Sequence, residues 1–309
     1  MFKKFICLFS IFFIFFPIHA QNPSIRLGII KGIACAPCAY LIENKAKLAV
    51  QDMDFKNFDS AQSELPALLK GEIDVGFLTA EDGAKVFTAG NASLLCLGVA
   101  QNGNAFLLTD DDKFNSIEDL KEKNLLCPPN DSSVKILENL LSKKGLSAVE
   151  ETGAVRLDFS FPASVMANKL ITGQSHFALL SEPYATVAML NSQKIRRAVS
   201  LQKIYGESES YSSYPAMLIV ARSDFARENP GLLRRFCDLY KTAVLWTNKN
   251  PAKAALLSEK HGIGFSVATV RASIPNAALT FRESRAAKSD IEKYLSLLGR
   301  KLPEEGFYF

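Results

Sequence analysis

The sequence predicts an α/β protein built from two similar lobes, because one pattern of helix, glycine and buried strand occurs twice. The first copy is SELPALLKGEIDVGFLTAED at residues 63–82, and the second is ANKLITGQSHFALLSEPY at residues 167–184. Gly71 and Gly173 hold equivalent places after the two helices, where a positive φ favours glycine. Both strands end in a polar turn. Ligands bind beyond the carboxyl ends of strands in open α/β sheets, so the two turns are the first candidates for a binding site.

The composition is that of a folded globular protein. Of the 309 residues, 48% are hydrophobic and 22% are charged, and a chain of this length can bury a large core and hold two domains. The net charge is only +4, and Lys and Arg form no dense block. Nucleic acid is therefore not a predicted partner.

The first 20 residues have the layout of a secretory signal peptide. Met1–Lys4 is positively charged, Phe5–Ile18 is an apolar run, and Ala20 offers a cleavage site. The apolar run is shorter than the roughly 20 residues that span a membrane. The alternative is an uncleaved anchor. Cys7 lies inside the run, where it does not suit a lipoprotein acceptor, so we predict export through a cleavable signal peptide.

The first half of the chain alternates between predicted strands and helices. It begins with a strand at Ile25–Ile30, and Pro37 then suits the first turn of a helix. Further strands are expected at Phe55–Phe58, Ile73–Leu78, Ser93–Val99 and Phe106–Thr109. Helices are expected at Ala39–Lys47, after the capping segment Asp59–Gln62, at Glu81–Phe87 and, as a single turn, at Ser116–Lys121.

The second half repeats this alternation and then becomes helical. Strands are expected at Asn124–Cys127, Val155–Phe159, Arg197–Leu201 and Ala216–Ala221. Helices are expected at Ser133–Lys144, Ala185–Leu190, Arg227–Asn248, Pro251–His261, Val267–Ser273 and Lys288–Leu298. Two crossings, near Gln101–Asn104 and through a polar loop at Tyr205–Tyr214, would join the first lobe, residues 25–103 and 206–309, to the second, residues 104–205.

The sharpest local motif is Cys35-Ala36-Pro37-Cys38. A strand followed by Cys-x-Pro-Cys at a helix start is how thioredoxin-like oxidoreductases present a reactive thiolate, although the rest of the chain lacks a thioredoxin layout. Three interpretations stay open for Cys35 and Cys38: redox catalysis, a labile disulfide or thiol at the mouth of the binding pocket, and two incidental small residues. The predicted role of the remaining cysteines of the mature chain is that of small buried hydrophobic residues. They are Cys96, Cys127 and Cys237. No metal site is predicted, because further soft ligands at a suitable spacing are missing.

The sequence gives little support for an enzyme. It contains no Gly-x-Ser-x-Gly or His-Glu-x-x-His motif. His176 is expected in the core, inside a buried strand. Glu81, Asp82 and Glu182 follow predicted strands, where a catalytic acid pair is one interpretation and ligand contact or helix capping is the favoured one.

Two predicted helix starts suit an anionic or polar group. The loop Lys31–Cys38 and the turn Pro128–Ser133 each connect a strand to a helix, and the free N–H groups of a helix start attract such groups. The hydroxyls of Ser132 and Ser133 would add to the second of these sites. Ordinary helix capping is the alternative, and the two uses can coexist.

Several segments, in this order along the chain, resemble the periplasmic substrate-binding proteins of ABC importers. They are Lys31-Gly32, Leu68–Val75, Leu179–Tyr184, Glu228-Asn229-Pro230, Asn250–Ala255 and Lys301–Phe309. The group that they resemble most is the nitrate, sulfonate, taurine and thiamine-precursor type, the SsuA/THI5-like or NMT1 family. The resemblance covers the chain from Ile25 to its end.

The resemblance implies a bilobed fold like that of the type II periplasmic binding proteins, which closes on a small molecule and delivers it to a permease in the inner membrane. It also implies a periplasmic monomer that needs no cofactor and is not an enzyme. The alternative is an enzyme on the same scaffold, either a pyrimidine-precursor synthase-like protein or a cysteine-dependent redox protein.

The residues predicted to contact a ligand lie on the polar turns and helix starts of both lobes. They are Ala34, Cys35, Ala36, Ser60, Gln62, Thr79, Glu81, Asn102, Ser132, Ser133, Ser181, Glu182 and Tyr184. Tyr211 and Tyr214 would stack on a flat ligand. No Arg stands at a predicted turn, and Arg156 and Arg222 are the nearest candidates for an anion clamp. A neutral or aromatic heterocycle is therefore favoured over a sulfonate.

Overall fold

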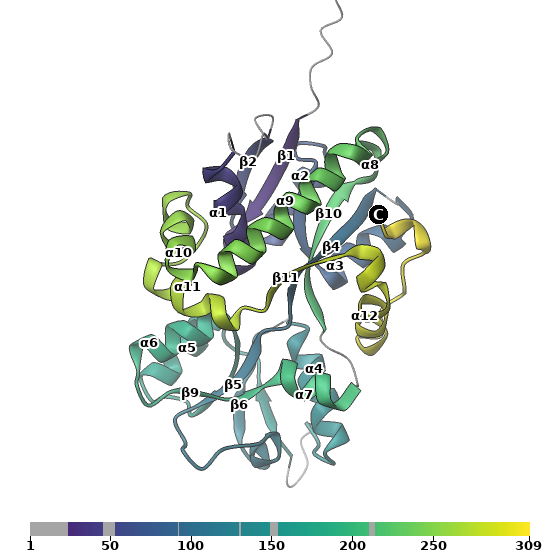
Figure 1. Cartoon of the computed structure of the whole chain (residues 1–309). Helices are drawn as coiled ribbons and strands as arrows, with labels where there is room; N and C mark the ends of the chain where they lie inside the picture. The colour runs from purple at the N-terminus through teal and green to yellow at the C-terminus, as the bar shows by residue number, and fades with distance from the viewer. Residues whose placement is uncertain (1–23, 46–52, 92, 130, 149–153, 210–213) are drawn as a thin grey trace, which may run out of the picture.

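The computed structural model describes residues 24–45, 53–91, 93–129, 131–148, 154–209 and 214–309, and it contains two mixed sheets (Figure 1). The first sheet has the order β11-β4-β10-β3-β1-β2 and the second has the order β7-β6-β8-β5-β9. The first sheet's strands are β1 (Ile25–Ile30), β2 (Met53–Phe58), β3 (Val75–Thr79), β4 (Leu94–Asn102), β10 (Pro215–Arg222) and β11 (Leu279–Glu283). The second sheet's strands are β5 (Ala105–Thr109), β6 (Asn124–Leu126), β7 (Arg156–Asp158), β8 (Phe177–Ser181) and β9 (Arg196–Ser200). The predicted α/β class with two sheets is confirmed.

Helices cover both faces of each sheet (Figure 1). On the first sheet, one face carries α1 (Ala36–Glu43), α9 (Pro230–Lys249), α10 (Pro251–Lys260) and α11 (Val267–Ser273), and the other carries α2 (Ala61–Leu69), α3 (Ala80–Val86) and α12 (Ser284–Leu297). On the second sheet, α5 (Ala163–Ile171) and α6 (Tyr184–Asn191) face α4 (Ser133–Lys143) and α7 (Leu201–Glu209) across the strands. The remaining short elements are α8 (Ser223–Glu228), η1 (Ile33–Cys35), η2 (Phe87–Asn91), η3 (Ile117–Leu120), η4 (Ile274–Asn276) and η5 (Glu305–Phe307).

In both sheets, the carboxyl ends of the parallel strands point toward the other sheet. In the first sheet β1, β2 and β3 are parallel, and β10 runs antiparallel between β3 and β4. In the second sheet β6, β7 and β8 are parallel, and β5 runs against β8 and β9. Because β4 leads directly into β5, the carboxyl ends of the parallel strands of both sheets lie toward the crossing (Figure 1).

The first crossing is confirmed at the predicted place. Gly103 and Asn104 alone separate β4 from β5, and Gly103 N–H donates to the carbonyl of Tyr214 over 2.8 Å. A Cβ on Gly103 would overlap the ring of Tyr214, so this position requires glycine. The second crossing, between α7 and β10, includes residues 210–213, which lie outside the described residues.

The structure confirms that the two sequence repeats form equivalent elements. Gly71 and Gly173 follow α2 and α5 with φ values of 73° and 70°, so both hold the left-handed conformation that the sequence predicted. The expectation for His176 is wrong. This residue lies just before β8, is exposed, and pairs through Nδ1 with Asp110 at 2.9 Å, because the strand starts one residue later.

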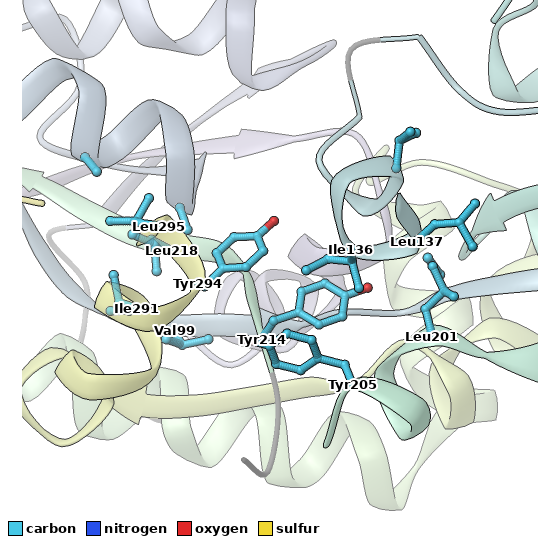
Figure 2. Packing of buried hydrophobic residues seen from close by; sticks show 14 of the residues in the cluster. Val99, Ile136, Leu137, Leu201, Tyr205, Tyr214, Leu218, Ile291, Tyr294 and Leu295 are labelled. Atoms are coloured by element: carbon cyan, nitrogen blue, oxygen red, sulfur yellow. The ribbon is translucent and has the colours of Figure 1, made fainter. Parts of the chain in front are cut away.

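One hydrophobic cluster runs through the crossing and joins the two sheets. It combines Val99, Leu218 and Leu295 from the first sheet and its helices with Leu137 and Leu201 from α4 and α7. Figure 2 shows these residues around three tyrosines that bridge the two groups. Buried apolar contacts therefore join the two sheets next to the crossing.

The predicted secondary structure differs from the structure at α7, β11 and α8. The predicted loop Tyr205–Tyr214 begins as helix α7, because Leu201 and Tyr205 lie one turn apart and both are buried. The strand β11 and the short helix α8 were missed. Within the described ranges, no helix is both long and apolar enough to cross a membrane. The predicted signal peptide, residues 1–20, lies outside those ranges.

Candidate functional site

The candidate site is the region where the two sheets face one another, which we call the junction. Four polar turns define it: Thr79–Asp82 after β3, Asn102–Asn104 between β4 and β5, Asp131–Ser133 before α4, and Ser181–Tyr184 after β8. Three of them directly follow strands whose carboxyl ends point toward the crossing, and the other, Asp131–Ser133, lies between β6 and α4 at the start of the helix. Both turns of the internal repeat are among them, and their ligand role stays a prediction.

The turn Thr79–Asp82 is built around a helix cap. Thr79 Oγ1 accepts a hydrogen bond from Asp82 N–H at 3.0 Å and donates to Asp82 Oδ2 at 2.9 Å, which fixes the start of α3. Glu81 forms an ion pair with Arg300, which follows α12. The Glu81 side chain keeps part of its surface exposed, so its carboxylate stays reachable from solvent.

The turn before α4 accepts a hydrogen bond from the other side of the junction. Tyr294 Oη, on α12, donates to Ser132 Oγ over 2.7 Å. Ser133 N–H donates to Asp131 Oδ1 at 2.8 Å, whereas the buried Ser133 hydroxyl has no hydrogen-bond partner among the described residues. A buried hydroxyl that lacks a partner is costly, so Ser133 is a candidate for hydrogen bonding to a bound molecule or water.

A second contact closes the other side of the junction. The ring of Tyr184, at the start of α6, meets the ring of Phe265 edge-on with centroids 5.4 Å apart. Phe265 lies in the loop between α10 and α11, where Gly264 approaches the backbone of Gly32 in the β1–α1 loop. The β1–α1 loop, the α10–α11 loop and α6 therefore form one continuous set of contacts.

Comparison with known proteins decides the family. A family model described as NMT1/THI5 like matches residues 52–254, which is more than half of the chain. The chain belongs to the NMT1/THI5-like family. The resemblance stated from the sequence segments is thereby confirmed. A search of curated proteins found no match.

Solved structures of low sequence identity share the fold of this NMT1/THI5-like chain. An ABC transporter protein from Parabacteroides distasonis has a TM-score of 0.78 at 18% identity, over 93% of this chain and 99% of that chain. The periplasmic aliphatic sulphonate binding protein SsuA from Escherichia coli has a TM-score of 0.73 at 15% identity, over 94% and 92%. The periplasmic nitrate-binding protein NrtA from Synechocystis has a TM-score of 0.62 at 14% identity, over 89% and 80%.

Glu182 does not fit the ligand role that we predicted. Its side chain is fully buried, forms an ion pair with Arg197 and accepts from Thr186 N–H at 3.2 Å. Both carboxylate oxygens are therefore used inside the NMT1/THI5-like fold. The interpretation of Glu182 changes from ligand contact to a buried ion pair that holds α6 against β9.

Tyr214 is also unsuited to stack on a ligand. Its ring is buried between Tyr294, which stacks on it at 5.5 Å, and Tyr205, which meets it edge-on at 5.2 Å (Figure 2). The two faces that a flat ligand would need are covered by the protein. Tyr211, its predicted partner, lies outside the described residues.

The Cys-x-Pro-Cys loop is more deeply buried than its predicted position at the mouth of a pocket implies. Ala34, Cys35 and Ala36 lie under α9, and Tyr240 Oη on that helix donates to the carbonyl of Ala34 at 3.3 Å. Any ligand contact in this stretch must use backbone groups. Cys35 and Cys38 are both free thiols in the structure.

The remaining predicted residues are accessible or partly so, and their ligand role stays a prediction. Ser60 Oγ caps α2 by accepting from Ser63 N–H at 3.3 Å, and Gln62 is exposed on the first turn of that helix. Ser181 ends β8. Asn102 ends β4, and its side-chain oxygen is buried with no partner in the described part of the chain.

The two arginines considered as anion clamps lie far from the junction. Arg156 starts β7 and donates to the carbonyl of Glu122 at 3.3 Å. Arg222 ends β10, where it pairs with Asp224 and lies 3.5 Å from Asp74. Both residues lie at strand ends that point away from the crossing, so neither can hold a ligand between the sheets.

Sequence reasoning missed three residues of the junction. Tyr294 reads as an ordinary apolar position of an amphipathic helix, Phe265 follows a Gly-Ile-Gly turn, and Arg300 stands in a polar tail. Each takes part in the junction only through a partner far away in the sequence. No local signal marks them.

The described residues offer no alternative centre for metal chemistry, because none of their His, Cys, Asp and Glu side chains form a group of three or more able to hold an ion. A hollow of about 840 Å³ lies away from the junction, between β4, α9 and the chain end. Its lining mixes both signs of charge and includes Arg234, Arg285, Asp238, Glu283 and Glu305. This lining shows no preference for one class of ligand.

Proposed function

We propose that this protein is an exported solute-binding protein, which captures a small molecule at the junction and delivers it to an ABC importer permease. The observation that carries the proposal is the meeting of both sheets by the carboxyl ends of their parallel strands around four polar turns. Family membership and the named structural neighbours, which are binding components of import systems, support it.

Ligand capture follows from two lobes that move about the crossings. The proposed lobes are residues 25–103 with 206–309, and residues 104–205. Free energy from ligand contacts on both lobes would favour the closed arrangement over an open one. The contacts of Tyr294 with Ser132 and of Tyr184 with Phe265 would then form and break as the lobes close and open.

The junction favours a neutral or cationic nitrogen heterocycle over a sulfonate. Its carboxylates include Glu81, Asp82 and Asp131, and Arg300 is already paired with Glu81. Among the described residues of the junction, the buried groups that lack a hydrogen-bond partner include the Ser133 hydroxyl and the Asn102 side-chain oxygen, and both are neutral. An oxygen acceptor and a hydroxyl suit the N–H and ring nitrogen atoms of a heterocycle, whereas a sulfonate would require donors and positive charge.

The finer parts of the proposal concern location and partners. We infer a periplasmic monomer with a cleavable signal peptide, an inner-membrane permease as its partner, and no enzymatic turnover. The structural neighbours are binding proteins, which supports the non-enzymatic interpretation over the enzyme alternative.

The test begins with native mass spectrometry of the purified protein, which should reveal a co-purified small molecule. A thermal-shift screen of pyrimidines, nucleosides, amino acids and sulfonates then assigns the class. A ligand at 100 times its Kd adds about 2.7 kcal/mol to stability, which is a clear shift in melting temperature. Absence of a co-purified molecule together with no shift from any class would contradict the proposal.

Single substitutions test whether the ligand binds at the junction. Ser133→Ala and Glu81→Gln should weaken binding of the identified ligand at least tenfold in calorimetry. Tyr308→Phe is the control. It removes a hydroxyl that lies away from the junction and donates to Glu292 Oε1 over 3.4 Å. Equal affinity in all three variants would place the ligand elsewhere.

A further inference from the structure

The helices α9 and α10 carry the net positive charge of the whole chain. Residues 230–260 contain six Lys and Arg but only two acidic residues, Asp238 and Glu259. The chain as a whole has a net charge of +4, so its other residues include equal numbers of positive and negative side chains. The excess of positive charge is therefore concentrated on the helical layer that covers one face of the first sheet (Figure 1).

The two most exposed large apolar side chains of the described residues lie on the same two helices. Leu245 on α9 keeps 64% of its surface exposed, and Leu256 on α10 keeps 57%. Only Asn250 separates α9 from α10, so each leucine lies within two helical turns of the corner between them. Single exposed leucines are ordinary, whereas two near one corner form a possible contact surface.

Three lysines flank these leucines. Lys241 and Lys249 lie four residues before and four residues after Leu245, so the three side chains share one face of α9. Lys253 lies three residues before Leu256 and shares a face of α10 with it. All three lysines are exposed, and none forms an ion pair within the part of the chain that the structure describes. We call these five residues the α9–α10 corner.

An aromatic pair lies beside the corner. The ring of Trp246, which follows Leu245 in α9, lies 4.6 Å from the ring of Tyr40 on α1, and both rings are half-buried. Because α1 packs against both α9 and α10, it holds the corner in place on the first sheet. Leucine, lysine and aromatic side chains together are typical of helices that lie at a membrane interface.

We propose that the α9–α10 corner binds the surface of a bilayer that contains anionic phospholipids. The three lysines would contact the headgroup phosphates, and the two leucines would enter the layer between headgroups and acyl chains. The apolar face of α9, with Leu233, Phe236 and Tyr240, is already packed on the first sheet, so the contact is peripheral. The inference goes beyond solute binding and does not depend on it.

An anionic bilayer suits the corner better than an acidic protein does. The positive charge of the corner comes from lysine alone. Lysine is depleted in protein–protein interfaces, whereas arginine, whose planar group matches carboxylates in a fixed geometry, is enriched there. Unpaired lysines on flexible side chains require no such match, and a fluid layer of phosphates offers none.

Vesicle binding tests the proposal. The purified protein is sedimented at low ionic strength with vesicles of phosphatidylglycerol and phosphatidylcholine in equal parts, and with vesicles of phosphatidylcholine alone. We expect binding to the anionic vesicles only, and we expect it to weaken as salt is added, because salt screens the attraction between exposed charges. Equal binding to both kinds of vesicle, or binding to neither, would overturn the proposal.

Two variants locate the contact on the protein. Lys241→Gln/Lys249→Gln/Lys253→Gln should weaken binding on the order of a hundredfold, because each lysine near an anionic bilayer contributes a factor of about five. Leu245→Ser/Leu256→Ser should weaken it on the order of tenfold, because two apolar side chains then stay out of the bilayer.

Matched controls change the same residue types elsewhere. Leu69→Ser/Leu190→Ser alters two leucines of similar exposure on α2 and α6, and Lys113→Gln/Lys121→Gln/Lys194→Gln removes the same amount of charge at three other exposed positions. Both controls should bind like the wild type, and circular dichroism confirms that each variant is folded. Every variant keeps the same N-terminal segment, so its apolar residues contribute equally to each measurement. Corner variants that bind like the wild type, or controls that lose binding to the same extent, would overturn the proposal.

Discussion

The hydroxyl of Tyr294 donates a hydrogen bond to Ser132 Oγ over 2.7 Å and so joins α12 on the first sheet to α4 on the second. The same Tyr294 ring stacks on Tyr214, which belongs to the segment that returns the chain to the first sheet. One residue thus contacts both a crossing segment and the opposite side of the junction. Its position makes it sensitive to the relative placement of the two sheets.

The first prediction concerns this hydrogen bond. Tyr294→Phe removes it and should lower the free energy of unfolding by about 1 kcal/mol, the usual value for one hydrogen bond. The ligand-free protein should also become more open, which small-angle X-ray scattering would record as a larger radius of gyration. Tyr308→Phe is the matched control. Scattering curves that coincide for the wild type and both variants would show that the bond does not restrain the sheets.

The second prediction concerns the tight packing at the first crossing. Gly103→Ala places a methyl group into the ring of Tyr214 and should cost about 1–3 kcal/mol in chemical denaturation, as overpacking does elsewhere. Gly231→Ala is the control, because it lies at the start of α9 with no atom within 4 Å of the added methyl group. The double variant Gly103→Ala/Tyr214→Leu should recover part of the loss. An unchanged loss in the double variant would mean that the strain arises elsewhere.

The sequence was informative about the fold where a local rule applies. Gly71 and Gly173 were predicted from their places after two helices, and both have positive φ values. The helix α7 was missed because its polar residues resemble a loop, whereas burial of Leu201 and Tyr205 one turn apart stabilises a helix. The edge strand β11 was missed because its alternation of apolar and polar residues covers only the four residues Leu279–Arg282.

The candidate site was harder to predict because its contacts join distant parts of the chain. Ser132 was chosen for its place before a helix, but its partner Tyr294 lies 162 residues away. Glu182 looked like a ligand residue because it follows a strand. Only the folded chain brings Arg197 beside it. A polar residue at a strand end is thus consistent with both a site and an internal ion pair, and the sequence alone does not separate them.

The third prediction tests the new interpretation of Glu182. Glu182→Gln leaves Arg197 without a charged partner, and breaking such a buried pair costs about 3 kcal/mol or more. Glu72→Gln, at an exposed pair with Lys56, should change stability little. Ligand affinity of the folded Glu182→Gln protein should match that of the wild type. A loss of affinity without a loss of stability would restore the ligand role.

The fourth prediction follows from the raised pKa of Glu64. Between the ordinary glutamate value of 4.5 and about 8, Glu64 is ionised in the unfolded chain but protonated in the folded protein. The folded state then binds one more proton, so this group lowers stability as pH rises, by up to about 1.4 kcal/mol per pH unit, and its effect is constant below and above this window. Glu64→Gln removes the titration and keeps an oxygen that can accept from Phe77 N–H.

The measurement is urea unfolding of the wild type and the variant at intervals from pH 5 to pH 8.5. Other groups titrate equally in both proteins, so the difference between the two curves isolates Glu64. We expect Glu64→Gln to gain steadily on the wild type up to about pH 8 and then to run parallel to it. Glu72→Gln, whose pKa is lowered by Lys56, should show no such gain in this range. Parallel curves across the whole range would mean that Glu64 is already ionised in the folded protein at these pH values, which would contradict its raised pKa.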